Sequence, residues 1–474
     1  MYFTGFTDSH ARRLRAVFRS ADWREVVGRL DVEAARHDLM TPPETENVFK
    51  VPVAQLVAIN QQKVRGMIAA GERDEERLLA TLGAWPARWP EDVPVRLSWV
   101  GINLSFRCNM KPPCIYCNQD PVEDRLRIED WQGLLRSLTP TEGEGAYVSF
   151  TGGEPLLLGE ALWGPEGLLR AAAEAGAASN VNTNALALTP SAALGLVRSG
   201  LMRIHISLDS HRPEVEDWIH QRKGRWQQIV GGLHNLQIAK AILNAQHPQI
   251  HLNCVLTRKN APDFPGFARF VLDMKPVVDG AISGDLDMHI IPVGGEDNRH
   301  LRLTAAGYLR FFTETWDEAN EAWDEYQLAR EVPEEKRGTL EKKVPFMSPF
   351  HRVEQRSSLE EWAEHAGRGM PASLALTDRC YVAPTQCFIL PNGAQYWCGG
   401  HSVSRPEPVG SVLVESIQEN IRRSIAQMAA LPAVQCRSCA GATLAINQRV
   451  EAELRKTIRE WLQPPTSTPV QPKT

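Results

Sequence analysis

The stretch that decides the fold runs from Trp99 to Cys117 and reads W-V-G-I-N-L-S-F-R-C-N-M-K-P-P-C-I-Y-C. A strand-like apolar run is followed at once by three cysteines, Cys108, Cys114 and Cys117, in the spacing C-x5-C-x2-C. Three thiolates without an obvious fourth ligand nearby suit an iron–sulfur cube with one open iron, or a zinc ion with one open position. The loop therefore predicts a metal centre at which a substrate or cofactor binds.

Outward from this loop, residues 96–300 alternate between strand-like and helical patterns. Apolar runs typical of strands occur at 98–104, 146–151, 179–183, 202–208, 250–257 and 286–292. Helical patterns fill most of the intervals, as in Pro190–Ser199 and Trp226–Leu243. Six strands alternating with helices predict parallel βαβ units, in an open sheet or a barrel fragment. In either arrangement, ligands collect at the carboxyl ends of the strands.

Length and composition describe an ordinary globular protein. The chain has 474 residues, of which 43% are hydrophobic and 23% charged, and its net charge is −5. This net negative charge does not indicate the basic surface with which proteins bind nucleic acids. The sequence shows neither a signal-peptide pattern nor an apolar run of the roughly 20 residues that span a bilayer. We therefore expect a cytoplasmic protein without nucleic-acid or membrane partners.

The length suggests more than one domain, and the patterns divide the chain into five parts. These are a helical N-terminal extension at 1–95, the strand–helix region at 96–300, a charged helical bridge at 301–365, a second cysteine-rich unit at 366–445, and a C-terminal helix with a Pro-rich, disordered tail at 446–474.

The nine cysteines favour metal binding over disulfides, because their number is odd and most are clustered at ligand spacing. Cys254 is different, since it lies in the apolar run His251–Thr257 and is expected to be a small core residue.

A second motif follows the next strand along the chain and reads S-F-T-G-G-E-P-L from Ser149 to Leu156. Gly152 and Gly153 would let the backbone approach a ligand closely, and Glu154 offers a carboxylate to an ammonium group. One strand–helix–strand unit separates this motif from the cysteine loop, so both are expected at the same rim of a parallel sheet. Together they fit a small zwitterion held over a metal.

With these two motifs the sequence resembles the radical S-adenosylmethionine (radical SAM) superfamily over residues 97 to 300. The resemblance implies a partial (β/α)6 TIM-like barrel, in agreement with the six strands counted above. It implies that the three cysteines hold a [4Fe–4S] cluster, whose open iron is chelated by the methionine part of S-adenosylmethionine. It also implies that Gly152, Gly153 and Glu154 contact the methionine ammonium and that Tyr116 lies near the adenine.

Further positions match the family one by one. The fourth strand ends in Ile-Ser207-Leu-Asp, which makes Ser207 a candidate for the ribose or the carboxylate of the cofactor. Arg222 resembles an arginine that pairs with the cofactor carboxylate, and Asn253 on the fifth strand is a further candidate. One departure is the cysteine spacing, since the family usually has three residues between the first two cysteines. Pro112 and Pro113 would stiffen the enlarged loop.

A third constellation lies near the C-terminus. Asn392-Gly393 between two apolar runs predicts a hairpin, and cysteines flank it on both sides. This segment resembles the auxiliary-cluster domain of SPASM/Twitch radical SAM enzymes, a small α+β unit, in its shorter Twitch form. The resemblance assigns an auxiliary [4Fe–4S] cluster, or alternatively a zinc ion, to Cys380, Cys398, Cys436 and Cys439. Cys387 does not fit that spacing and is expected to be a strand residue that packs inward.

The resemblance implies an enzyme that reductively cleaves S-adenosylmethionine to a 5′-deoxyadenosyl radical, which abstracts hydrogen from an unactivated C–H bond. The expected substrate is a small molecule or natural product, the auxiliary cluster assists an oxidation, and a flavodoxin- or ferredoxin-type protein supplies the electron. His289, Asp287 and Glu296, near the end of the sixth strand, are candidates for a catalytic base. Two alternatives stay open: a maturase of a ribosomally made peptide, and a non-catalytic iron–sulfur or zinc protein.

Overall fold

The computed structural model describes most of the chain. The described residues are 2–44, 49–117, 119–138, 145–279, 281–283, 285–294, 296–337, 358–368, 379–404, 407–430 and 441–463. Within these ranges, no helix is both long enough and apolar enough to cross a membrane.

A nine-stranded sheet organises the molecule, in the order β11-β10-β9-β1-β2-β3-β4-β5-β8. Six of these strands run parallel and coincide with the six predicted runs: β1 (Trp99–Asn103), β2 (Tyr147–Thr151), β3 (Ala178–Thr183), β4 (Arg203–Ser207), β5 (Gln249–Leu256) and β8 (Asp287–Pro292). In the part of the chain that the structure describes, no pairing joins β8 to β11, so the sheet stays open. The prediction of a partial (β/α)6 barrel is therefore confirmed.

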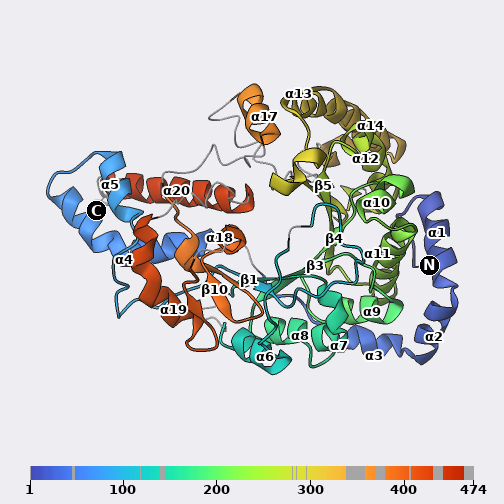
Figure 1. The fold of residues 1–474 in the computed structure, drawn as a ribbon, viewed down its shortest axis with the longest axis horizontal. Helices are drawn as coiled ribbons and strands as arrows, with labels where there is room; N and C mark the ends of the chain where they lie inside the picture. Colours follow the sequence, from blue (N-terminus) through green and yellow to red (C-terminus); the bar gives the residue numbers. More distant parts are fainter. Residues whose placement is uncertain are drawn as a thin grey trace, which may run out of the picture.

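Helices cover the outer face of these strands, as Figure 1 shows. They are α6 (Ile128–Arg136), α7 (Glu160–Trp163), α8 (Leu168–Glu174), α9 (Pro190–Arg198), α10 (Pro213–Ile219), α11 (Arg225–Leu243) and α12 (Phe264–Asp273), with the 3-10 turns η1 (Pro155–Leu158) and η2 (Ala261–Asp263). The side chains of β4 alternate: Ile204 and Ile206 are fully buried, whereas His205 and Ser207 are only partly buried. Since successive side chains point to opposite faces, the apolar set packs under the helices and the polar set lines the inside of the barrel.

The N-terminal helices lie in two places (Figure 1). Three of them, α1 (Asp8–Phe18), α2 (Ala21–Arg29) and α3 (Val32–His37), pack on α9 and α11 of the barrel. The next two, α4 (Lys50–Ala69) and α5 (Glu75–Leu82), pack instead on α20 (Gly441–Leu462) at the opposite end of the molecule. The 1–95 segment thus contributes to both the barrel and the C-terminal region.

The predicted hairpin at Asn392-Gly393 is confirmed. Strands β9 (Gln386–Ile389) and β10 (Ala394–Tyr396) pair antiparallel, and Gly393 has φ +86°, which favours glycine. Strand β9 also pairs parallel to β1, with Trp99 opposite Gln386. The C-terminal unit therefore continues the barrel sheet at its free edge.

The remaining elements complete the C-terminal unit and the bridge. The former contains η7 (Ala383–Thr385), α18 (Gly399–Ser404), β11 (Gly410–Ser411), α19 (Ile417–Ser424) and η8 (Ile425–Ala430). The latter contains η3 (Glu296–Leu301), α13 (Ala305–Arg310), η4 (Phe311–Thr315), α14 (Trp316–Ala329), η5 (Glu334–Lys336) and α17 (Leu359–Gly367). A short two-stranded ribbon, β6 (Val277–Val278) and β7 (Ala281–Ile282), stands apart from the main sheet.

A second apolar core supports the segment before β9, whereas β9, Trp397 and α19 pack in the core of the barrel. This second core is built from α4, α5 and α20 together with the segment before β9, through Leu56, Val64, Leu78, Leu79, Leu82, Tyr381, Val382, Val450, Leu454 and Ile458. Burial of these side chains is the main force that holds α4 and α5 against α20.

Candidate functional site

The cysteine loop leaves β1 and is held on one side by the rim after β2. Backbone N–H groups of Gly153 and Glu154 donate to the carbonyl oxygens of Ser105 and Arg107, at 2.7 and 2.8 Å. Gly152 has φ +132°, and a Cβ atom at Gly153 would lie 2.1 Å from the Arg107 oxygen. The two glycines are therefore required because the rim closes on the cysteine loop itself, a reason that the sequence did not reveal.

On its other side the loop is held by the C-terminal end of α10. The N–H of Ile115 donates to the carbonyl of Ile219 at 3.0 Å, and the amide of Gln221 donates to the carbonyl of Pro113 at 2.7 Å. The loop is thus fixed between β2 and α10, although about 100 residues separate Pro113 from Gln221 in the sequence.

The three thiols occupy one neighbourhood. Cys108 and Cys114 are partly buried and Cys117 is exposed. Burial raises the pKa of Cys108, and the charges of Glu154, Cys114 and Cys117 raise it further, while the Met110 N–H lowers it. A metal binds such cysteines as thiolates, so metal binding would release their protons. This donor set, with one exposed member, fits a three-cysteine iron–sulfur cluster that has an accessible corner.

Glu154 is buried and fully engaged by the protein. Its carboxylate accepts hydrogen bonds from the Thr183 hydroxyl and the Asn184 N–H, both at 2.7 Å, and from the Leu156 N–H at 2.9 Å. Burial raises its pKa, and these hydrogen bonds partly offset that effect. The side chain of Asn184 also reaches the loop, where it donates to Asn109 at 2.8 Å. Glu154 therefore ties the ends of β2 and β3 together beneath the loop.

Tyr116 points from the loop to the end of β4. Its hydroxyl donates to Oδ2 of Asp209 at 2.7 Å, and its carbonyl accepts from the amide of Asn298 at 3.1 Å. The other oxygen of Asp209 accepts from the Val255 N–H at 2.6 Å. Burial and the negative charge of Glu216 raise the pKa of Asp209 to about 7.

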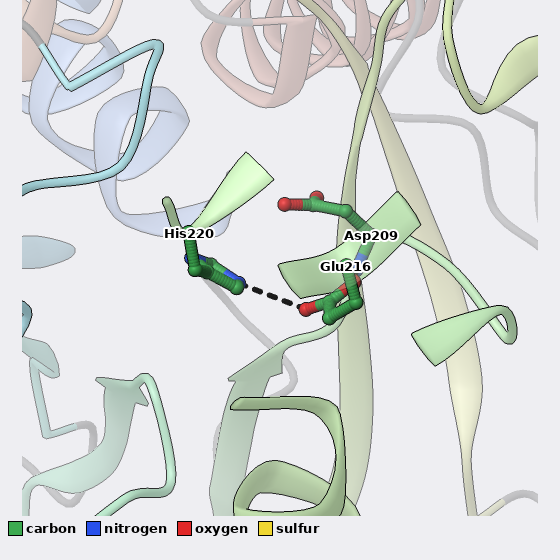
Figure 2. Close-up of side chains that lie close together, drawn as sticks. All are labelled: Asp209, Glu216 and His220. Carbon is green, nitrogen blue, oxygen red and sulfur yellow. Dashed lines mark hydrogen bonds and ion pairs between the residues drawn. The ribbon is translucent and has the colours of Figure 1, made fainter. Parts of the chain in front are cut away.

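Asp209, Glu216 and His220 form a compact buried group beside the loop, as Figure 2 shows. Nε2 of His220 lies 2.8 Å from Oε1 of Glu216, and its Nδ1 lies 3.1 Å from Sγ of Cys114. Burial alone lowers the pKa of His220, but the hydrogen bonds to Cys114 and Glu216 outweigh it and raise the pKa to about 11. Glu216 and His220 were not among the site residues expected from the sequence. The available signal was that they lie four residues apart, and so on one helix face, in the segment that follows the fourth strand.

Ser207 and Asn253 lie opposite each other on β4 and β5, among the partly buried positions of the barrel interior. Beside them, the rings of His205, His251 and His289 have centroids 5.0–5.1 Å apart. Burial is the largest cause that lowers their pKa values, to about 4, 2 and 3 respectively, so all three are neutral at pH 7. Of these three histidines, only His289 was expected from the sequence to be a candidate catalytic base.

The other two candidate bases, Asp287 and Glu296, do not belong to this histidine group. Asp287 forms an ion pair with the buried Lys275, with Nζ and Oδ1 3.0 Å apart. Glu296 begins the turn η3, and its side chain lies outside the described part of the structure.

Arg222 is exposed and lines a surface groove of about 850 Å³, together with Ile115 of the cysteine loop and Trp218. A second arginine, Arg225, is buried at the start of α11. Its guanidinium lies 3.5 Å from the carbonyl of Asn109, and the charges of Cys108 and Cys114 act on it. The structure thus brings Arg225 to the cysteine loop as well, and the sequence analysis had not considered it.

In the second cysteine group, the structure describes two of the four assigned residues. Cys380 precedes β9, Cys398 follows β10, and both are partly buried. Cys436 and Cys439 lie outside the described residues. Cys387 on β9 and Cys254 on β5 are almost fully buried, which confirms the predictions that they are packing residues.

Comparisons with known proteins agree with the barrel. Residues 102–241 match the sequence profile of the Radical SAM superfamily. The mycofactocin maturase MftC of Mycolicibacterium smegmatis is 28% identical over 182 residues, which cover 37% of this chain and 41% of that protein. A probable GTP 3′,8-cyclase of Methanocella arvoryzae is 33% identical over 141 residues, which cover 29% of this chain and 43% of that protein. The chain therefore spans less than half the length of these two relatives.

A solved structure also matches at low identity. SuiB of Streptococcus suis bound to S-adenosylmethionine matches with a TM-score of 0.46 and 15% identity, over 74% of this chain and 72% of that chain.

Proposed function

We propose that this chain, whose residues 102–241 are a radical SAM domain, is an enzyme that uses S-adenosylmethionine to abstract hydrogen from an unactivated C–H bond. When bound, a [4Fe–4S] cluster and S-adenosylmethionine supply a 5′-deoxyadenosyl radical. The protein contributes binding, orientation of the C–H bond and exclusion of water and oxygen.

One observation carries this proposal: the cysteine loop is clamped between the Gly152-Gly153-Glu154 rim and the end of α10. Hydrogen bonds from Gly153, Glu154 and Gln221 hold its backbone, so the three thiols need little reorganisation to bind a cluster. The exposed Cys117 leaves one side of the site open to a cofactor.

The remaining residues support roles around the cofactor. We assign the backbone of the rim, Gly152 to Glu154, to the methionine ammonium, since the Glu154 carboxylate is engaged by Thr183 and Asn184, and Tyr116 to the adenine. Ser207 and Asn253, neighbours on β4 and β5, offer hydrogen bonds to the ribose or the carboxylate. Exposed Arg222 can swing toward the carboxylate from the groove beside Ile115.

The interior of the barrel is where the substrate binds. Neutral imidazoles of His205, His251 and His289 and the amide of Asn253 surround this space, while Asp287 is neutralised by Lys275. Such a lining suits a polar substrate rich in hydroxyl or amide groups more than a strongly charged one. His289 on β8 is our candidate base because of its place in the barrel interior; burial lowers its pKa to about 3, so the ring is neutral at pH 7 but only weakly basic.

An auxiliary cluster on Cys380, Cys398, Cys436 and Cys439 completes the proposal, with a role in an oxidation of the substrate. The hairpin that precedes Cys398 continues the barrel sheet at β1, so Cys398 lies near the edge of that sheet. The odd number of cysteines suits a reducing compartment, and we place the protein in the cytoplasm with a flavodoxin- or ferredoxin-type electron donor.

The substrate is a small molecule or natural product in our first proposal. The similarity to a GTP 3′,8-cyclase supports this class. The similarity to the mycofactocin maturase MftC favours the second candidate, a ribosomally made peptide. A short reading frame for a precursor peptide beside the gene would decide for the peptide.

Anaerobic reconstitution tests the proposal. We expect about eight irons per chain and formation of 5′-deoxyadenosine when S-adenosylmethionine and a reductant are added. If the active protein holds only about four irons per chain, the first cluster is retained in the proposal, and the second site is empty or binds zinc. Zinc in place of iron, or no 5′-deoxyadenosine from iron-loaded protein, would contradict the enzyme and favour a non-catalytic metal protein.

A further inference from the structure

His220 and Glu216 form a buried pair directly behind Cys114. The side chains are 1% and 0% exposed, and the two residues lie four apart at the C-terminal end of α10. Nδ1 of His220 lies 3.1 Å from the sulfur of Cys114. Its Nε2 lies 2.8 Å from the carboxylate of Glu216, as Figure 2 shows.

The hydrogen-bonding capacity of the three groups decides the direction of these contacts. A carboxylate only accepts, so Nε2 of His220 carries a hydrogen toward Glu216. The other oxygen of Glu216 accepts the N–H groups of Asp209 and Ser210, at 2.9 and 2.8 Å, which anchors the pair to the segment just after β4. When Cys114 binds a metal, its thiolate can only accept, so the 3.1 Å contact then requires a hydrogen on Nδ1 of His220 as well.

The same residues do not suit a second metal site, although one ligand atom from each of Asp209, Glu216 and His220 lies within 4.8 Å of the others. Both oxygens of Glu216 and both nitrogens of His220 already take part in hydrogen bonds. The two oxygens of Asp209 accept from Tyr116 and Val255. A cation would have to break this network, so we interpret the group as a hydrogen-bonded support.

Cys114 is distinguished from the other two thiols by this contact. Sγ of Cys108 lies 3.4 Å from the Met110 N–H and 3.7 Å from the amide of Asn184, both longer distances, and Cys117 is exposed. Hydrogen bonds to a cluster's sulfurs withdraw negative charge from it and raise its reduction potential.

We propose that His220, oriented by Glu216, is a positioning residue that donates a hydrogen bond to the Cys114 thiolate and thereby raises the reduction potential of the cluster. The inference rests on the proposed function, because it takes Cys114 as a cluster ligand. It assigns to α10 a role in electron acceptance as well as in holding the loop.

The test is a redox titration of the full reconstituted chain, followed by electron paramagnetic resonance on the signal that changes when S-adenosylmethionine is added. His220→Phe removes both nitrogens and keeps a ring, His220→Gln keeps one N–H donor, and Glu216→Gln removes the charge that orients the histidine. His234→Phe is the matched control, since His234 is also buried but lies on α11 beside His10.

We expect His220→Phe to shift the equilibrium toward the oxidised cluster by on the order of tenfold, or about 59 mV for one electron, with a smaller shift in His220→Gln and none in His234→Phe. Iron loss from folded His220→Phe, with full iron in His234→Phe, also supports the positioning role. An unchanged potential in both His220→Phe and Glu216→Gln overturns the inference. Absence of any signal that responds to S-adenosylmethionine in the unmutated chain instead overturns the proposed function.

Discussion

The two cysteine regions of this molecule are built in opposite ways. The loop with Cys108, Cys114 and Cys117 is held by strands and a helix of one continuous barrel segment, from β1 to α10. The described pair of the other region, Cys380 and Cys398, flanks the hairpin, and the segment at Cys380 rests on α4, α5 and α20. Indole Trp85 donates to the carbonyl of Cys380 at 3.2 Å, and neighbouring Tyr381 is buried among α4, α5 and α20.

From this difference we expect the two sites to fail independently. The barrel loop depends on specific hydrogen bonds at a rim, whereas Cys380 lies beside the apolar core that α4, α5 and α20 form. The predictions below test that independence.

Removing one ligand from each site should separate their roles completely. Cys114→Ala should form no 5′-deoxyadenosine above background and lose about four irons per chain, because three thiolates are the minimum for the first cluster. Cys398→Ala should lose a similar amount of iron but still cleave S-adenosylmethionine. Iron analysis and chromatography of 5′-deoxyadenosine measure both effects.

Cys254→Ala serves as the control, since this buried thiol is a packing residue and should keep the iron of both sites. Equal loss of cleavage in Cys114→Ala and Cys398→Ala would contradict the independence of the two regions.

Weakening the second core should release the C-terminal site alone. Leu454 on α20 is fully buried, so Leu454→Ala should lower the free energy of unfolding of the C-terminal region by about 2–5 kcal/mol. We expect iron loss limited to the second site, with S-adenosylmethionine cleavage retained, measured by denaturant titration and iron analysis.

The matched variant is Leu236→Ala, a fully buried position on α11 of the barrel, which should reduce cleavage first. The same pattern of losses in both leucine variants would show one cooperative unit in place of two.

Disturbing the rim should affect the first site alone. Glu154→Gln replaces one carboxylate oxygen by an NH2 group, which cannot accept the hydrogen bonds that this oxygen now accepts. We therefore expect a loss of about 1–3 kcal/mol in stability and slower cleavage of S-adenosylmethionine. Exposed Glu123→Gln is the control. Thermal unfolding and single-turnover cleavage measure the effect, and a Glu154→Gln protein that matches Glu123→Gln in both would contradict the clamp.

The barrel, but not the second core, should be sensitive to mild acid. His251 has a folded pKa of about 2, below its ordinary value of 6.5, so the stability that it contributes is complete above pH 6.5 and declines as the pH falls below that value. Between pH 7.5 and 5.5 this single histidine accounts for about 1.4 kcal/mol of lost stability.

His251→Gln should remove that part of the pH dependence, as measured by urea unfolding at the two pH values. His37→Gln, at an exposed position on α3, should leave it unchanged. An identical pH dependence in all three proteins would mean that the lumen histidines are hydrated and titrate normally.

Much of the fold followed from local patterns. The six strand-like runs, the helices between them and the Asn392-Gly393 hairpin could be predicted, because period and turn chemistry act within a few residues. The packing roles of Cys254 and Cys387 could be predicted for the same reason, since both lie in apolar runs.

Other features could not be read locally. The split of the N-terminal helices, with α1–α3 on the barrel and α4–α5 on α20, depends on contacts between residues hundreds of positions apart. The polar wall of His205, His251 and His289 required the register of three strands, and a shift by one residue would have turned each ring to the other face.

By itself, the sequence determined that three thiols, a glycine-rich rim and six parallel strands occur in this protein, because these features are written in spacings of a few residues. The tertiary structure adds which parts meet: the rim closes on the cysteine loop, His220 and Glu216 lie behind Cys114, and α4 and α5 share a core with α20. The physical reason is that hydrogen bonds and apolar contacts depend on distance in space, and folding alone brings these distant residues within a few ångströms of each other.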